Sequence, residues 1–279
     1  MKSNIVKMCL CAFFFIGGMI FARAMQVDYI SFKPSVGAFS LSADGRVATI
    51  CVDTADYKGV RLAARNLGTD IGRVTGTAAD VSLSLSSERG VVVAGTIGKN
   101  RQIDEWVKQG KLDVSAIEGK WESYLIQTVD GNLVIAGSDK RGTIFGIYDL
   151  SEKIGVSPWH YFADVPTQRH AALYVKPGRY VQDSPKVKYR GIFLNDEWPS
   201  LGGWASKKFG GFNSRFYAHV FELLLRLKAN YMWPAMWASS FYEDDPANGQ
   251  LADDMGIVMG TSHHEPMMRP HKDYTKRRK

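Results

Sequence analysis

Cysteine is scarce in this sequence, with three among 279 residues. Cys9 and Cys11 lie in an apolar run near the N-terminus, within a segment that we expect to be removed. Only Cys51 would then remain, so an intramolecular disulfide is excluded and the fold must be stabilised by packing. Cys51 has no histidine near it in the sequence, which favours a core position over a catalytic thiol.

The sequence also lacks an apolar run with the length of about 20 residues that a membrane-spanning helix needs. The run at residues 8–21 follows Lys2 and Lys7 and precedes Ala22-Arg23-Ala24. A positive start, a short apolar region and small residues at the cleavage site predict a signal peptide over residues 1–24. A buried helix is the alternative. A signal peptide implies an exported protein, periplasmic or secreted, with no stable membrane anchor after its removal.

A basic face for a polyanion is missing too, although the formal net charge is +7. The signal peptide carries three of these positive charges, and the last nine residues carry a net four. Residues 25–270 are therefore neutral, with charge only at the two ends of the chain. This pattern argues against nucleic acid as a partner.

Sequence patterns for metal, nucleotide and serine-hydrolase chemistry are absent. His263-His264-Glu265 lacks the H-E-x-x-H spacing of a zinc site. The glycine-rich stretch 137–142 fits neither the dinucleotide fingerprint nor the P-loop, so a tight turn is favoured over a phosphate cradle. Ser214 and Ser262 lack the context of a nucleophile elbow. We therefore predict no metal site.

The organisation of the chain changes near residue 180, which predicts two domains after the signal peptide. Residues 25–185 form an N-terminal mixed α/β domain, and residues 186–279 form a second domain. In the first, we expect strands at 46–52 and 90–97, a hairpin of 123–129 and 132–136 around Asp130-Gly131, and helices at 58–74, 99–109 and 142–154, the last capped by Gly155. The aromatic residues Trp159, Tyr161 and Phe162 fit either a sugar-stacking surface or a plug between domains.

In the second domain, strands are expected at 189–194, 230–237 and 257–261. A helix capped by Asn213, with Phe216, Val220, Leu223, Leu224 and Leu227 as its apolar stripe, and a short helix at 249–254 separate them. This order predicts the first three βα units of a (β/α)8 TIM barrel. A whole barrel takes roughly 250 residues, so we expect an incomplete, truncated barrel that is inactive and aggregation-prone by itself.

Polar and aromatic residues follow each expected strand, where barrel enzymes place their chemistry. A carboxylate can accept hydrogens from sugar hydroxyls, an indole can stack on a sugar ring, and imidazole can bind an acidic sugar. Only one of Asp196 and Glu197 is expected to face the site, because neighbouring strand residues point oppositely. Structural roles remain as alternatives: helix capping for Asp196, ion pairing for Glu197 and core packing for the tryptophans. The candidates are Asp196, Glu197, Trp233, Trp237, His263, His264 and Glu265.

Three segments resemble the opening barrel strands of glycoside hydrolase family 115. They are 190–197 (RGIFLNDE), 228–237 (KANYMWPAMW) and 260–267 (GTSHHEPM). Upstream, residues 136–146, Ser157-Pro158-Trp159 and 163–166 resemble the N-terminal α/β domain of that family. The resemblance covers about residues 40 to 269, and the three barrel segments occur in the family's order.

The resemblance implies hydrolysis of the α-1,2 bond that joins glucuronic acid, or its 4-O-methyl form, to xylan. The mechanism would be inverting and would use no cofactor. Xylan or glucuronoxylan oligosaccharides would be the partners, and a homodimer would form only in the full-length enzyme. Asp196 matches a family position near the uronic acid, so Asp196 and Glu197 become the catalytic candidates. The substrate-binding candidates are Trp233, Trp237, His263, His264 and Glu265. The presumed general acid would lie on a later strand. A non-catalytic carbohydrate-binding protein and a gene remnant are the alternatives.

Overall fold

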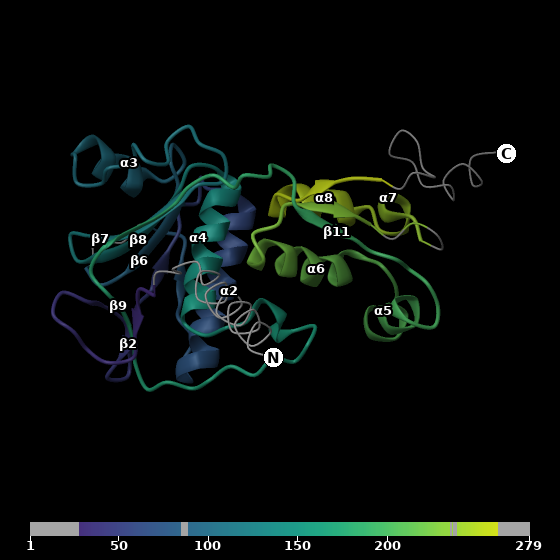
Figure 1. The fold of residues 1–279 in the computed structure, drawn as a ribbon, viewed down its shortest axis with the longest axis horizontal. Coiled ribbons are helices and arrows are strands. Elements are labelled where there is room, and N and C mark those ends of the chain that lie inside the picture. Colours follow the sequence, from purple (N-terminus) through teal and green to yellow (C-terminus); the bar gives the residue numbers. More distant parts are fainter. Residues whose placement is uncertain (1–27, 85–88, 235, 237–238, 262–279) are drawn as a thin grey trace, which may run out of the picture.

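The structure, a computed structural model, describes residues 28–84, 89–234, 236 and 239–261 (Figure 1). The predicted signal peptide lies outside them. A six-stranded mixed sheet, a four-stranded antiparallel sheet and their helices occupy one half of the molecule. A three-stranded parallel sheet with its helices occupies the other (Figure 1). None of the helices in the described segments combines the length and apolar content of a membrane span.

The larger N-terminal sheet has six strands in the order β10-β7-β8-β6-β4-β5. Strands β4, β5, β6 and β8 run parallel, and β7 runs antiparallel to both neighbours. Their bounds are β4 Ile50–Cys51, β5 Val81–Ser82, β6 Val92–Thr96, β7 Tyr124–Val129, β8 Asn132–Gly137 and β10 Arg179–Gln182. This sheet confirms the mixed α/β character of the N-terminal part.

Two cores form on the two faces of this sheet because strand side chains alternate. Val92 and Ile135 pack with helices α2 (Lys58–Thr75) and α4 (Lys140–Lys153). Val93 and Val134 pack with α3 (Arg101–Lys108) on the opposite face. The predicted face of α2 is buried, and Cys51 lies in the α3 core.

Helix starts in this unit follow capping side chains. Asn100 accepts hydrogen bonds from the backbone N–H groups of Gln102 and Ile103 at the start of α3. Asp139 accepts one from Gly142 N at 2.7 Å and begins α4 earlier than predicted. The predicted hairpin is confirmed, since Asp130 and Gly131 have φ of 50° and 81°, as in a type I′ turn.

One predicted strand is divided between two sheets. The sequence predicted a single strand over 46–52, but β3 (Arg46–Val47) pairs with β2 (Phe39–Ala43) and β4 joins the six-stranded sheet. The smaller sheet is antiparallel, in the order β1-β9-β2-β3, with β1 at Ile30–Ser31 and β9 at Leu173–Val175. Alternation of apolar and polar side chains indicates an extended segment, but it does not indicate which strand that segment pairs with. The sequence therefore did not predict the division of residues 46–52 between two sheets.

The third sheet is parallel, in the order β11-β12-β13, with helical connections. Its elements are β11 Gly191–Phe193, α5 Leu201–Phe209, α6 Ser214–Arg226, β12 Tyr231–Trp233, α7 Phe241–Asp244, α8 Ala247–Met255 and β13 Val258–Met259. The predicted order of strands is confirmed, and Asn213 caps α6. Helix α5 was not predicted, because its two glycines are weak helix formers. Leu227 is 42% exposed, since α6 ends before it.

Aromatic residues fill the contact between the two halves of the molecule. Tyr161, next to the 3₁₀ turn η1 (Pro158–His160), stacks on His219 of α6 with ring centroids 3.9 Å apart. Phe162 lies 6.1 Å from the ring of Trp204 in α5. These contacts favour the plug interpretation for Tyr161 and Phe162, whereas Trp159 remains 45% exposed.

The glycine-rich stretch 137–142 packs too closely for larger residues. A Cβ on Gly137 would lie 2.1 Å from Thr143 N, and one on Gly142 would lie 2.3 Å from Ser123 O. This close packing supports the tight-turn interpretation.

The same edge of the sheet also carries buried carboxylates. Burial raises the pKa of Asp56, which accepts hydrogen bonds from the backbone and hydroxyl of Thr96.

Asp53, at the same edge, is expected to make stability depend on pH. Burial raises its pKa, but hydrogen bonds from Arg101 and Ala55, with the Arg101 charge, outweigh burial and lower it to about 2. This is below the unfolded value of about 3.9, so the stabilisation is present above that pH and is lost as pH falls through about 2. Arg101→Gln should therefore lower stability at pH 6, with the difference from wild type shrinking toward pH 2.

Urea unfolding measured from pH 7 to pH 2 tests this expectation. Lys108→Gln removes an exposed positive charge from the other end of α3 and serves as the control. A deficit of Arg101→Gln that stays constant over the whole pH range would show that Asp53 is not the group involved.

Candidate active site

The ends of β11 and β12 lie side by side, because Phe193 pairs with Trp233 in the parallel register. The loops that follow these strands therefore meet at one edge of the sheet. Asp196, Glu197 and Trp233 belong to this edge. The other sequence candidates, Trp237, His263, His264 and Glu265, lie outside the described residues, and their roles stay predictions.

Asp196 joins the two loops. Its side chain is buried, and Oδ2 accepts hydrogen bonds from Ser239 N at 2.9 Å and from Ser239 Oγ at 2.7 Å. Asp196 follows β11, and Ser239 follows β12. Two donors on one carboxylate oxygen fix the orientation of the acid, which is what a residue that positions substrate or water requires.

Glu197 has different surroundings from its neighbour. Its side chain is exposed, while its backbone oxygen accepts hydrogen bonds from Ser200 Oγ at 3.0 Å and Gly202 N at 3.1 Å. The backbone of Glu197 thus organises the turn into α5, and its carboxylate faces solvent. Of the two adjacent acids, Asp196 has the more enclosed and better oriented carboxylate.

An aromatic pair lies on one face of the sheet at the same edge. The rings of Phe193 and Trp233 have centroids 4.6 Å apart at an interplanar angle of 51°. Met232, the neighbour of Trp233, is buried in the core shared with α6, so Trp233 and Phe193 point to the opposite face. Phe193 is 49% exposed. A partly open aromatic surface at this edge of the sheet can hold a sugar ring.

Trp198 is a residue of this edge that sequence reasoning did not single out. It is 64% exposed and precedes Pro199 through a cis peptide bond. A Cβ on Gly202 would lie 2.7 Å from Trp198 Nε1, and one on Gly203 would lie 3.5 Å from the six-membered ring of the indole. The indole therefore lies against the first turn of α5. The sequence did contain a signal for Trp198, because it is an aromatic residue directly after two acids at the end of a predicted strand.

Gly202→Ala and Gly203→Ala are expected to have opposite effects. A Cβ at Gly202 would meet Asp196 O at 2.7 Å, so the loop must shift, and the free energy of unfolding should fall by about 1–3 kcal/mol. At Gly203 the added methyl makes ordinary contact, and alanine in a helix should raise the free energy of unfolding by about 0.5–1 kcal/mol. Denaturant unfolding of both variants measures the difference; equal stabilities would refute the close approach at Gly202.

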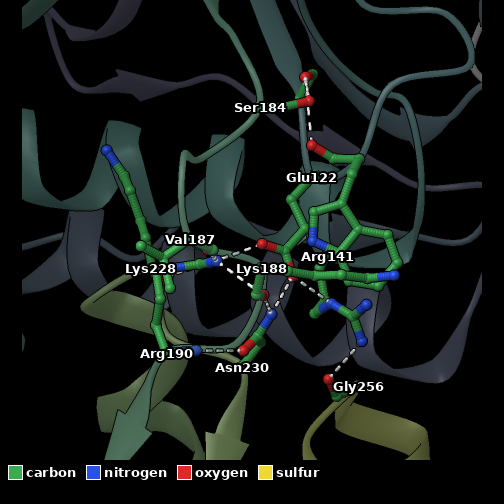
Figure 2. A network of polar contacts seen from close by, with 12 residues as sticks. Glu122, Arg141, Ser184, Val187, Lys188, Arg190, Lys228, Asn230 and Gly256 are labelled. Carbon is green, nitrogen blue, oxygen red and sulfur yellow. Dashed lines mark hydrogen bonds and ion pairs between the residues drawn. The ribbon is translucent and has the colours of Figure 1, made fainter.

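A buried carboxylate holds the other ends of β11 and β12 (Figure 2). The Glu122 side chain has no exposed surface. Its Oε1 accepts hydrogen bonds from Arg141 Nε and Asn230 Nδ2, and its Oε2 accepts one from Arg190 Nη2, all at 2.6 Å. Arg141 belongs to α4, whereas Arg190 and Asn230 directly precede β11 and β12. Glu122 therefore links the six-stranded sheet to the parallel one.

Further bonds in this network set the alignment of the parallel strands. Arg190 N donates to Asn230 Oδ1 at 3.0 Å, and Asn230 N donates to Arg190 O at 2.8 Å. Arg141 Nη1 donates to Gly256 O at 3.0 Å, just before β13 (Figure 2). Because a one-residue slip reverses every side chain of a strand, these contacts determine which face carries Phe193 and Trp233.

Within the residues that the structure describes, no group of three or more histidine, cysteine, aspartate or glutamate side chains could hold a metal ion. The described side chains at this edge that could contact a substrate are a carboxylate, hydroxyls and aromatic rings.

Comparison with known proteins places these residues in a family. The sequence profile described as "Glycosyl hydrolase family 115" matches residues 182–279. A solved family GH115 4-O-methyl-alpha-glucuronidase with specificity for decorated arabinogalactans is 33% identical, with a TM-score of 0.72. The alignment covers 83% of this chain and 30% of that one, so the chain spans about a third of its length. No curated protein sequence matches.

Two further solved structures have lower similarity. A Flavobacterium johnsoniae chitobiase is 11% identical, with a TM-score of 0.49, over 88% of this chain and 36% of its own. A Streptomyces plicatus N-acetyl-beta-hexosaminidase is 13% identical, with a TM-score of 0.49, over 86% of this chain and 46% of its own. Similarity at this level says nothing about activity.

Proposed function

Because the chain belongs to glycosyl hydrolase family 115, we propose that the whole protein is a glycoside hydrolase that removes glucuronic acid, or its 4-O-methyl form, from xylan. The observation that carries this proposal is the Asp196 carboxylate, held by Ser239 across two strand ends. It lies on the same loop edge as the Phe193 and Trp233 rings. Residues 182–279, which match the family, include all of these groups.

The proposed reaction is inverting hydrolysis of the α-linked uronic acid. Inversion needs an acid that protonates the leaving oxygen and a base that activates water, with the carboxyl groups roughly 6.5–9.5 Å apart. We assign Asp196 to binding the uronic acid or positioning the water, because its carboxylate is buried and oriented. The parallel strands β11, β12 and β13 would be the first strands of a TIM barrel over residues 186–279. Residues 1–24 would direct export.

Two polysaccharides are candidates for the backbone that carries the uronic acid. The matched glucuronidase is described as specific for decorated arabinogalactans, so decorated arabinogalactan is the second candidate beside glucuronoxylan. Incubating the whole protein with each polysaccharide and quantifying free uronic acid decides between them. Release from glucuronoxylan supports the proposal, and release only from arabinogalactan changes the backbone. Binding of the protein to either polysaccharide without release of uronic acid would instead support a non-catalytic carbohydrate-binding protein.

A further inference from the structure

Trp198 presents an indole ring whose two faces differ. One side lies against the glycines at the start of α5, at the ordinary contact distance of 3.5 Å for a Cβ on Gly203. The residue is nevertheless 64% exposed, against 45% for Trp159 and 37% for Trp204. An indole supported on one side and open on the other is a flat surface of the kind that binds the C–H face of a pyranose ring.

The loop that carries Trp198 is built rigidly. Ser200 Oγ and Gly202 N both donate to the backbone oxygen of Glu197, and Trp204 N donates to Ser200 O at 3.1 Å. The site for a Cβ on Gly202 touches both the Trp198 indole and the backbone oxygen of Asp196. The same helical turn therefore positions the open ring and the residue that carries the buried carboxylate, so little ordering is needed when a ligand binds.

We propose that Trp198 is a stacking platform for a neutral pyranose ring of the polysaccharide backbone, beside the site in which Asp196 accepts hydrogen bonds from sugar hydroxyls or from the attacking water. This inference rests on the proposed function. The exposed carboxylate of Glu197 adjoins Trp198 in the chain. A negative charge there disfavours a uronic acid on the ring and can accept hydrogen bonds from the hydroxyls of a neutral sugar. Trp198 would thus select the neutral sugar of the backbone.

Binding of a neutral xylo-oligosaccharide to the whole protein, measured by calorimetry, tests this assignment. Trp198→Ala should weaken binding about tenfold, within the range that stacking on an aromatic ring provides, and Trp198→Phe should restore most of it. Trp159→Ala removes another exposed indole, beside η1, and should bind as wild type. Because the Trp198 ring is mostly exposed, the melting temperature of Trp198→Ala should match that of wild type.

The outcomes separate this inference from the proposed function. Unchanged oligosaccharide binding by Trp198→Ala in a protein that releases uronic acid would overturn the platform alone. Loss of binding in a protein that releases no uronic acid would keep the platform and reject the hydrolase. A wild-type protein that binds no neutral xylo-oligosaccharide would overturn the platform, and a uronic-acid release assay on the same sample would judge the proposed function separately.

Discussion

Replacing Glu122 by alanine is expected to lower the free energy of unfolding by about 3–5 kcal/mol, because it leaves buried positive charge without its partner. Glu122 accepts hydrogen bonds from Arg141, Arg190 and Asn230, whose side chains are mostly or fully enclosed. Removing the carboxylate leaves two guanidinium groups and an amide facing an apolar methyl. Chemical denaturation followed by circular dichroism measures the change.

The matched control is Asp183→Ala. Asp183 pairs with Lys120 at 3.0 Å, but both side chains are largely exposed, so this variant should unfold at the denaturant concentration of wild type. Glu122→Gln should fall between the two, since the amide keeps the shape and one acceptor oxygen but loses the charge. If Glu122→Ala were as stable as Asp183→Ala, the network in Figure 2 would not be what joins the two halves of the molecule.

Asp196→Asn is expected to reduce the rate of uronic acid release by the whole protein by about 100-fold or more, the scale of a lost positioned acid or base. The amide oxygen can still accept a hydrogen bond from Ser239 N, so the loop geometry should persist and the melting temperature should change little. Release of uronic acid from glucuronoxylan under initial-rate conditions gives the comparison.

Glu197→Gln provides the comparison for this prediction, because it removes the same charge from the neighbouring, exposed side chain. We expect a smaller loss, below about tenfold, as for a polar group that contacts substrate at the rim of a site. If Glu197→Gln were the more damaging change, the role in substrate binding or water positioning would have been assigned to the wrong acid.

Sequence patterns predicted the helices, strands and turns that depend on residues close together in the chain. Helix α2 was visible from the spacing of Val60, Ala63, Leu67 and Ile71, all buried as expected. The hairpin followed from Asp130-Gly131, and the β11-β12-β13 order followed from alternating strand and helix signals. Each of these depends on residues close together in the chain, which is why periodicity and turn chemistry were sufficient.

Features that depend on distant partners were missed. The bonds of Glu122 join residues 19, 68 and 108 positions apart, and no pattern around Glu122 indicates them. Helix α5 is stabilised by contact of its glycines with the 196–198 loop, although glycine disfavours helices. Asp196 was recognised from its place after a strand, but its partner Ser239 required knowledge of which loops meet.

The stereochemistry of hydrolysis tests the proposed function most directly. Time-resolved proton NMR of the whole protein acting on glucuronoxylan identifies the sugar released and its first anomer. Inverting cleavage of an α-linked glucuronic acid predicts that the β-anomer appears first and then mutarotates. The α-anomer appearing first would contradict the inverting mechanism, and the absence of any released uronic acid would contradict the hydrolase itself.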